Sequence, residues 1–428
     1  MSLPAAPEAR WLPSRVVVEV LAAGLVVLAV GAVVGRPDVA VLAVAPLLTA
    51  ERLLRSRPSG VALASSAAEA GEAGTLTTTA QVQVPPATVA LVVRAQLPTG
   101  RPAEAVVAVR GGRRTLRATT ASLRTGPVPA PDLEHVAVGP GAGSRSAVTT
   151  ERPRTLRIAP RARPLPAAPV PSRLRGVAGS HESRRPGEGG SLRDVHPFGP
   201  GDRMSRIDWR TTARRSPQLE QLYVRRTLGL AEATVTLVVD SRDEVGPDPT
   251  TWGLGGGLPG SERTSLDLAR EAAASLAQLY LSQGDRLALE DLGRRRHPGR
   301  PGSGRRHVAR VLDALAQMAP EGEPLRRVRA PRIAAGSLVY VLSTFLDPEA
   351  ALVAEQWAAS GHRVVAVDVL PRLVPRRLDG RQRLAMRVVT MRREDRLAAL
   401  AAAGVPTVRW SEDPARDLLA LARLERRR

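Results

Sequence analysis

From residue 234 onward, apolar strand patterns alternate with amphipathic helix patterns along the chain. The first strand pattern, TVTLVVD (234–240), is an unbroken apolar run that ends on an aspartate. Such alternation predicts βαβ units, in which helices cover both faces of a mostly parallel sheet. We therefore predict a Rossmann-like α/β domain. Its strands are expected at 234–240, 285–292, 337–344, 363–370 and 405–410, and its helices at 261–283, 305–319, 348–360, 393–403 and 414–425.

Charged residues are concentrated just before this domain, in GPGDRMSRIDWRTTAR (199–214). Two carboxylates and four arginines surround one tryptophan there. The tract resembles the signature of the domain of unknown function 58 family, bacterial proteins with a von Willebrand factor A-like domain. Upstream, His196 and Phe198 stand where family members often have Arg-x-Tyr. The resemblance is carried by Pro200, Gly201, Asp202, Arg206, Ile207, Asp208, Trp209, Ala213 and Arg214.

This signature allows a structural or a functional interpretation. In the structural one, which we favour, Trp209 plugs the edge of the sheet and the charged side chains form a buried ion network. Breaking such a buried pair costs about 3–5 kcal/mol. In the functional one, the same residues present a recognition surface to a partner. The members of the expected network are Asp202, Arg206, Asp208 and Arg214.

The resemblance also implies a magnesium site after the first strand. Von Willebrand factor A domains hold Mg²⁺ with an Asp-x-Ser-x-Ser loop, and hard oxygen ligands suit this cation. Asp240 matches the first ligand, but Arg242 and Glu244 replace the two hydroxyls, and Arg242 brings a positive charge. We therefore expect no cofactor and an ion pair of Asp240 with Arg242 or another arginine. The alternative is a degenerate Mg²⁺ site completed by Asp243, Glu244 and Asp347.

An apolar run at the N-terminus indicates a membrane anchor. Residues 16–34 carry a single charge, Glu19, and approach the length that a transmembrane helix needs. A second apolar stretch, 37–54, is shorter and contains Pro46. We predict a transmembrane helical hairpin over residues 1–58, rather than a cleaved signal peptide or a buried core helix.

The flanking charges predict the orientation of this hairpin. Arginines precede the first span and follow the second, whereas the turn between them has only Arg36, beside Asp38. The positive-inside rule then places both ends, and the bulk of the chain, in the cytoplasm of a multi-pass cell-membrane protein. If the second stretch does not span, the bulk lies outside instead.

Residues 60–160 show period-two alternation with many Thr and Val, broken by Gly, Pro and Asp. This pattern predicts a small all-β sandwich domain with strands near 75–84, 87–97, 103–110, 113–120, 133–138 and 154–160. A Pro/Gly-rich linker and loop follows over residues 161–200. The signature and the von Willebrand factor A-like domain make up residues 201–428.

The net charge of +21 would normally suggest nucleic acid or anionic lipid as a partner. However, the 62 basic residues are all arginine and are mixed with 41 acids along the chain, which indicates a biased coding composition. The absence of cysteine excludes disulfides and thiolate sites. We therefore expect nucleic-acid binding to be unlikely.

The resemblance implies a function as well. Such proteins look like companions of MoxR-type AAA+ ATPases, acting in assembly or maturation of envelope complexes. We expect a membrane-anchored, non-enzymatic adaptor or scaffold that works through protein–protein interaction. The alternatives are a metal-dependent enzyme with an acidic site near Asp240, and an arginine-driven binder of nucleic acid or anionic lipid.

Overall fold

The structure, a computed structural model, forms two compact units, which are described separately. The first contains most of residues 11–158, and the second contains residues 124–126 and most of 159–426. The residues described are 11–59, 63–70, 75–96, 102–109, 112–121, 123–129, 132–150, 155–171, 174, 180–252, 262–294, 299–321, 329–374 and 378–426.

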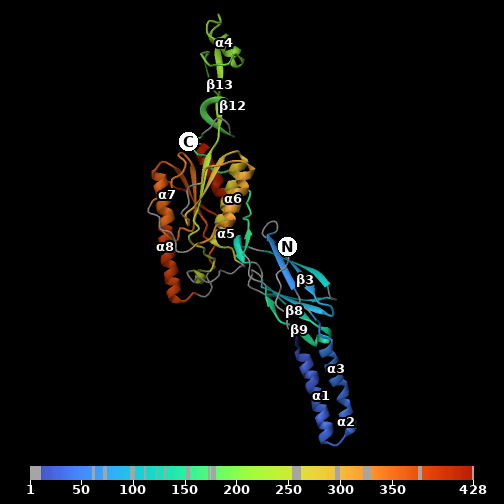
Figure 1. Cartoon of the computed structure of the whole chain (residues 1–428). Coiled ribbons are helices and arrows are strands. Elements are labelled where there is room, and N and C mark those ends of the chain that lie inside the picture. The colour runs from blue at the N-terminus through green and yellow to red at the C-terminus, as the bar shows by residue number, and fades with distance from the viewer. Residues whose placement is uncertain are drawn as a thin grey trace. The chain divides into compact units, whose positions relative to one another are not determined.

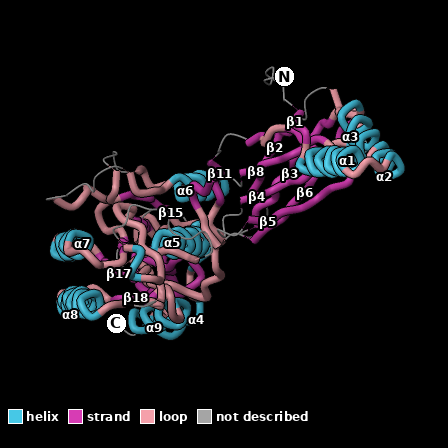
Figure 2. The backbone as a smooth tube through the Cα atoms, turned by 90° about the horizontal axis from the view of Figure 1, so that it is seen from below, coloured by secondary structure: helices cyan, strands magenta, loops and turns pink. Residues whose placement is uncertain are grey.

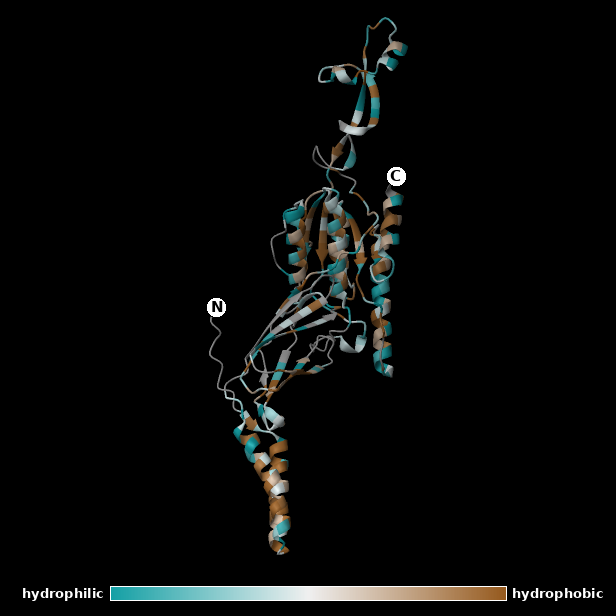
Figure 3. Ribbon diagram, turned by 90° about the vertical axis from the view of Figure 1, so that its right-hand side faces the viewer, coloured by the Kyte–Doolittle hydropathy of each residue, from teal (hydrophilic) through white to brown (hydrophobic). Residues whose placement is uncertain are grey.

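The first unit begins with a strongly apolar helix, α1 (Arg15–Val33) (Figure 1). Its mean hydropathy is 2.7 and its length is sufficient to cross a membrane, and most of its surface is not covered by the rest of the protein. Figure 3 shows this helix as mostly hydrophobic along its length. Among the residues that the structure describes there is thus one candidate membrane helix, near the N-terminus.

The second apolar stretch folds as two shorter helices, α2 (Pro37–Leu42) and α3 (Val44–Arg55). Pro46 has no N–H to donate to the carbonyl of Leu42, which accounts for the interruption. Both helices contact α1. A Cβ built on Gly31 would lie 2.5 Å from the backbone nitrogen of Ala40, so only glycine permits this close approach.

The other described residues of the first unit form mainly β-strands, as their alternating pattern predicts. One antiparallel sheet has the order β1-β9-β8-β4-β5 with β10 beside β8, and another has the order β2-β3-β6. Val82 and Val84 of β3 share a core with Leu91 of β4 and Ala137 of β8, so the two sheets pack together.

The strands of these two sheets are β1 (Trp11–Pro13), β2 (Leu63–Ala70), β3 (Thr75–Val84), β4 (Ala90–Gln96), β5 (Pro102–Ala108), β6 (Gly112–Ala121), β8 (Asp132–Val138), β9 (Ser144–Ser146) and β10 (Thr149–Thr150). A separate pair consists of β7 (Gly126–Pro129) and β11 (Thr155–Ile158), and the 3-10 turn η2 (Pro140–Ala142) precedes β9.

The second unit is built on a five-stranded, all-parallel sheet with the order β15-β14-β16-β17-β18. In chain order this is 2-1-3-4-5, one of the common doubly wound arrangements. The predicted α/β class and parallel sheet are confirmed. The strands are β14 (Thr234–Val239), β15 (Arg286–Asp291), β16 (Leu338–Ser343), β17 (Arg363–Asp368) and β18 (Thr407–Arg409).

Helices cover both faces of this sheet (Figure 2). On one face, α5 (Ser265–Ser282), α6 (Arg305–Gln317) and α9 (Pro414–Arg426) share a core with the strands. On the other face, α7 (Glu349–Ala359) and α8 (Gly380–Ala402) form a second core. Helix α8 begins at Gly380, well before the predicted 393. The prediction missed the first half of this helix because its buried residues all lie in the second half, so the first half shows no apolar pattern that faces the core.

A two-stranded antiparallel ribbon, β12 (His181–Pro197) and β13 (Tyr223–Ala231), leads into β14. The prediction of a linker and loop over 161–200 is therefore wrong for 181–197. Two short helices lie between the strands of the ribbon, η3 (Met204–Arg206) and α4 (Trp209–Arg215), and a further turn, η4 (Pro249–Thr251), follows β14.

The base of this ribbon is fixed to the sheet by one carboxylate. Asp285, which is fully buried just before β15, accepts a hydrogen bond from the backbone of Ala233 at 2.8 Å. Its other oxygen lies 2.9 Å from Nε2 of His181 at the start of β12. Both strands of the ribbon are thereby tied to the same point beside β14.

Candidate functional site

Two groups of predicted site residues lie in the second unit. The first is at the carboxyl ends of the neighbouring strands β14 and β16, where the order of the sheet reverses. Ligands of open α/β sheets bind at this topological switch point. Asp240 directly follows β14, and Ser343 ends β16.

Arg242 contacts several acidic side chains at this edge of the sheet. Its Nε donates to Oδ1 of Asp240 at 2.8 Å, and its Nη2 donates to Oδ2 of the same carboxylate at 2.8 Å. This two-point geometry is the strongest form of an arginine–carboxylate pair. Ser343 adds a hydroxyl that donates to Asp240 at 2.8 Å. The expected ion pair between Asp240 and Arg242 is present.

The same guanidinium also reaches the start of α7. Its Nη2 lies 3.1 Å from Asp347, and its Nη1 lies 2.7 Å from Glu349. The fold thus brings Asp347, which sequence analysis named as a possible metal ligand, to Arg242 as an ion-pair partner, together with Glu349, which sequence analysis missed. Glu349 lies far from Asp240 in the sequence, and only the pairing of β14 with β16 brings it near.

The pair at the centre of this cluster is almost completely buried, whereas Asp347 is 45% exposed. The side chains of Arg242 and Asp240 are 4% and 2% exposed. Burial alone would lower the pKa of Arg242, but the hydrogen bonds and charge of Asp240, with the charges of Asp347 and Glu349, raise this pKa above its ordinary value. The guanidinium is therefore permanently charged.

Unlike Arg242, the neighbouring Asp243 changes its protonation state near neutral pH. Its burial, followed by the negative charges of Asp240 and Asp347, raises the pKa of Asp243 to about 7. Glu244, the other residue named as a possible oxygen ligand, binds different partners. Its carboxylate accepts from Arg124 at 2.6 Å and from the hydroxyl of Thr264 at 2.5 Å.

These residues do not fit a magnesium ion. The guanidinium of Arg242 fills the position between Asp240, Asp347 and Glu349 that a cation would occupy. Within the described ranges, no group of three or more histidine and acidic side chains is arranged to hold a metal.

The second group, the signature, folds around one end of the ribbon. Asp202 accepts from Arg226 of β13 at 3.3 Å and from the backbone of Gly199 at 3.0 Å. Its carboxylate also lies 3.4 Å from Nε2 of His196. These donors outweigh the effect of burial and lower the pKa of Asp202. Gly201 adopts φ +91°, a left-handed conformation that glycine permits.

Asp208 has a different role, because it caps α4. Its side chain accepts from the backbone of Thr211 at 2.9 Å, and this bond lowers the pKa of Asp208. Arg225 of β13 lies 3.5 Å from the same carboxylate. Two arginines of β13, which sequence analysis did not single out, thus pair with the acids of the signature.

Arg206 and Ile207 attach the signature to the ribbon. Arg206 donates to the carbonyl of Gly187 in β12 at 3.0 Å. Ile207 is buried and bridges to Val224 in β13. Since a two-stranded ribbon is marginal by itself, these contacts stabilise its end. Pro200 and Arg214 are exposed.

The expectation that Trp209 plugs the edge of the sheet is wrong. The indole is 63% exposed at the start of α4, and Met204 in η3 is 74% exposed. The reason is local: α4 has seven residues and packs against the end of β13, where the ribbon offers no second layer to bury a large ring.

Comparison with known proteins identifies this part of the chain. Residues 194–376 match the family described as protein of unknown function DUF58. This part of the chain is therefore similar to DUF58 proteins. The expected similarity to the domain of unknown function 58 family is thereby confirmed, and both the signature and the Arg242 cluster lie inside the matched residues.

Relatives of the chain exist in mycobacteria. An uncharacterized protein of Mycobacterium bovis and an uncharacterized protein of Mycobacterium tuberculosis are each 30% identical to it over 216 residues. The match covers 47% of this chain and 62% of the relatives, so it spans less than two thirds of their length. No solved structure matches the chain.

Proposed function

We propose that the protein is a membrane-anchored, non-enzymatic adaptor or scaffold whose α/β domain is von Willebrand factor A-like and cytosolic. Its partner is an AAA+ ATPase of the MoxR type, with which it acts in assembly or maturation of envelope complexes. The observation that supports a partner most directly is the exposure of Trp209 within the DUF58 signature.

An exposed tryptophan in this setting favours protein recognition. Burying an indole in a partner removes a large apolar surface from water, and tryptophan and arginine are enriched among residues that dominate binding energies. The segment around Trp209 is fixed by defined hydrogen bonds: Asp208 caps α4, and Asp202 and Arg206 bind to the strands of the ribbon. The chain therefore presents the indole on an ordered element.

The edge of the sheet supports a function without catalysis. Asp240 is bound at two points by Arg242, and Asp347 and Glu349 contact the same guanidinium. Carboxylates held in this way are poorly placed to take up a proton or a metal. The alternative of a metal-dependent enzyme near Asp240 is therefore less well supported.

In this proposal the N-terminal helices anchor the protein. Helix α1 provides one span, and α2 with α3 provides the second, so that the arginine-rich flanks and the bulk of the chain face the cytoplasm. The close packing of α1 on α2 and α3 supports such a hairpin.

The test uses the full-length protein in detergent and a purified MoxR-type ATPase from the same organism. We expect Trp209→Ala to weaken binding at least about tenfold, as loss of a central aromatic contact does. Met391 is a similarly exposed apolar residue on α8, so Met391→Ala is the matched control and should bind like the wild type. Equal binding by Trp209→Ala and the wild type would refute the proposal.

A further inference from the structure

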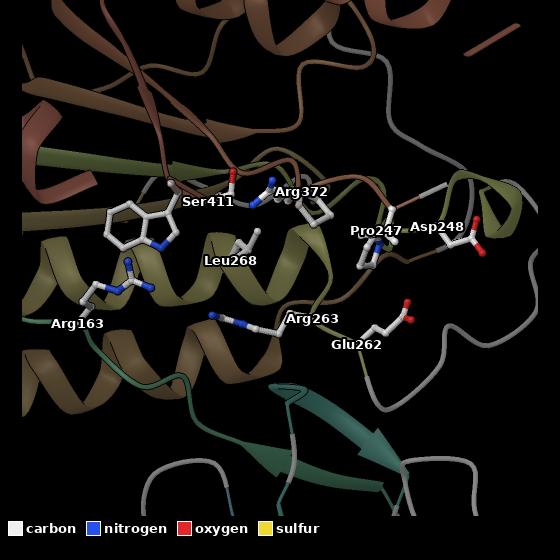
Figure 4. Close-up of a pocket in the computed structure, with 11 residues that line it drawn as sticks. Arg163, Pro247, Asp248, Glu262, Arg263, Leu268, Arg372 and Ser411 are labelled. Atoms are coloured by element: carbon white, nitrogen blue, oxygen red, sulfur yellow. The ribbon is translucent and has the colours of Figure 1, made fainter. Parts of the chain in front are cut away.

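A pocket of about 390 Å³ lies at the carboxyl edge of the parallel sheet, beside the start of α5 (Figure 4). This volume is typical of sites for small molecules. The pocket involves neither the signature nor Arg242. It is lined by residues that follow β14, β17 and β18 and by the first turns of α5, and among them are Pro247, Leu268, Arg372, Val374 and Ser411.

Three arginines gather at one end of this pocket. In Figure 4 the guanidinium groups of Arg163, Arg263 and Arg372 lie around Leu268, whereas Asp248 and Glu262 lie at the other end. The three arginines come from three separate segments of the chain, which the fold brings together. One end of the pocket therefore carries more basic than acidic side chains.

Two of these guanidiniums are held in place by Glu271 of α5. One carboxylate oxygen lies 3.1 Å from Nη2 of Arg163, and the other accepts from Arg263. The indole of Trp410 donates to the same carboxylate at 3.1 Å, and Arg163 lies over the ring of Trp410 at 5.9 Å. The backbone of Arg163 is also fixed by a hydrogen bond to Ser275 at 2.7 Å.

This arrangement leaves donors for a ligand. A guanidinium has five N–H donors in a planar fork, and one shared carboxylate uses only some of those on Arg163 and Arg263. Arg372 is exposed at the rim and makes no ion pair with the described residues. Leu268, Val374 and Pro247 supply an apolar wall.

We propose that this pocket binds a small molecule that carries an oxyanion, a carboxylate or a phosphate monoester, on a compact apolar body. Arg263 and Arg372 bind the oxyanion together with Arg163, and the body packs against Leu268. Glu271 is a positioning residue that orients two of the three guanidiniums. The position at the carboxyl ends of the strands agrees with the general location of ligands in such sheets.

Isothermal titration of the full-length protein in detergent, at constant ionic strength, tests this proposal with phenyl phosphate and phenylacetate as probes. The wild type should bind at least one probe saturably, at one site per chain. Arg263→Gln and Arg372→Gln should each weaken binding about tenfold or more, since each removes a charged hydrogen bond. Arg387→Gln, an exposed arginine on α8, is the control and should bind like the wild type.

The binding of the two probes distinguishes the classes of ligand. Binding of phenyl phosphate alone indicates a phosphate ligand, and binding of phenylacetate alone indicates a carboxylate ligand. The proposal is overturned if neither probe binds the wild type, or if both pocket variants bind as tightly as Arg387→Gln. Thermal unfolding of each variant serves as the control that its fold is retained.

Discussion

The edge of the sheet at Asp240 and the end of the ribbon at Trp209 use the same residue types in opposite ways. At the edge, Arg242 and Asp240 are buried and satisfy one another, as buried charges must. At the end of the ribbon, Arg225 pairs with Asp208 while 59% of its side chain stays exposed, and the indole is open to solvent. The contrast shows that paired charges can fill a buried site in one region and, in another, fix a short helix while its tryptophan stays exposed to solvent.

The largest difference between the two regions should appear in stability when an arginine is removed. Arg242→Ala leaves Asp240 buried without its partner and should lower the free energy of unfolding by about 3–5 kcal/mol. Arg225→Ala removes a half-exposed pair and should cost at most about 1 kcal/mol. Chemical denaturation measures both values, and similar losses would contradict the proposed contrast.

A pair of tryptophan variants sharpens the comparison. Trp357 of α7 is 3% exposed in the core, so Trp357→Ala should lower the free energy of unfolding by about 3–5 kcal/mol. Trp209→Ala should change it by less than about 0.5 kcal/mol, because its ring is mostly in water already. A large loss of stability in Trp209→Ala would show that the indole has a structural role after all.

The smallest expected effect concerns pH at the edge of the sheet. Because the pKa of Asp243 is raised to about 7, the folded protein keeps a proton that the unfolded chain loses near pH 4. This residue therefore contributes stability that is full below about pH 4 and is lost as the pH rises through about 7, on the order of 1–4 kcal/mol.

Asp243→Asn should flatten the dependence of the free energy of unfolding on pH between about 4 and 7. The control is Asp395→Asn, an exposed carboxylate on α8, which should keep the wild-type profile. Denaturation at a series of pH values measures both, and identical profiles for Asp243→Asn and the wild type would contradict the raised pKa.

Sequence analysis located the parallel sheet well, for a physical reason. Strands such as β14 and β16 are buried on both faces, so they read as unbroken apolar runs. The ribbon gives no such signal, because few of the residues of β13 are buried and β12 is rich in Gly, Arg and Ser. For the same reason the exposure of Trp209 could not be predicted: the pattern of the signature is local, whereas burial depends on what packs above it.

The candidate site shows a similar division. The pairing of Asp240 with Arg242 was predictable because the two residues are neighbours after one strand. The contributions of Glu349, Arg225 and Arg226 were not, because strand order and ribbon register bring them in from distant segments. The pocket between Arg163 and Arg372 likewise exists only once β17 and β18 lie beside the start of α5.

The single carboxylate of Asp285 at the root of the ribbon has a mechanical consequence. Because Asp285 contacts His181 and Ala233 at once, and only two residues separate β13 from β14, the ribbon is joined to β14 without a flexible linker. A force applied to the ribbon would therefore be transmitted directly to β14, and the hydrogen bonds of Asp285 lie on that path.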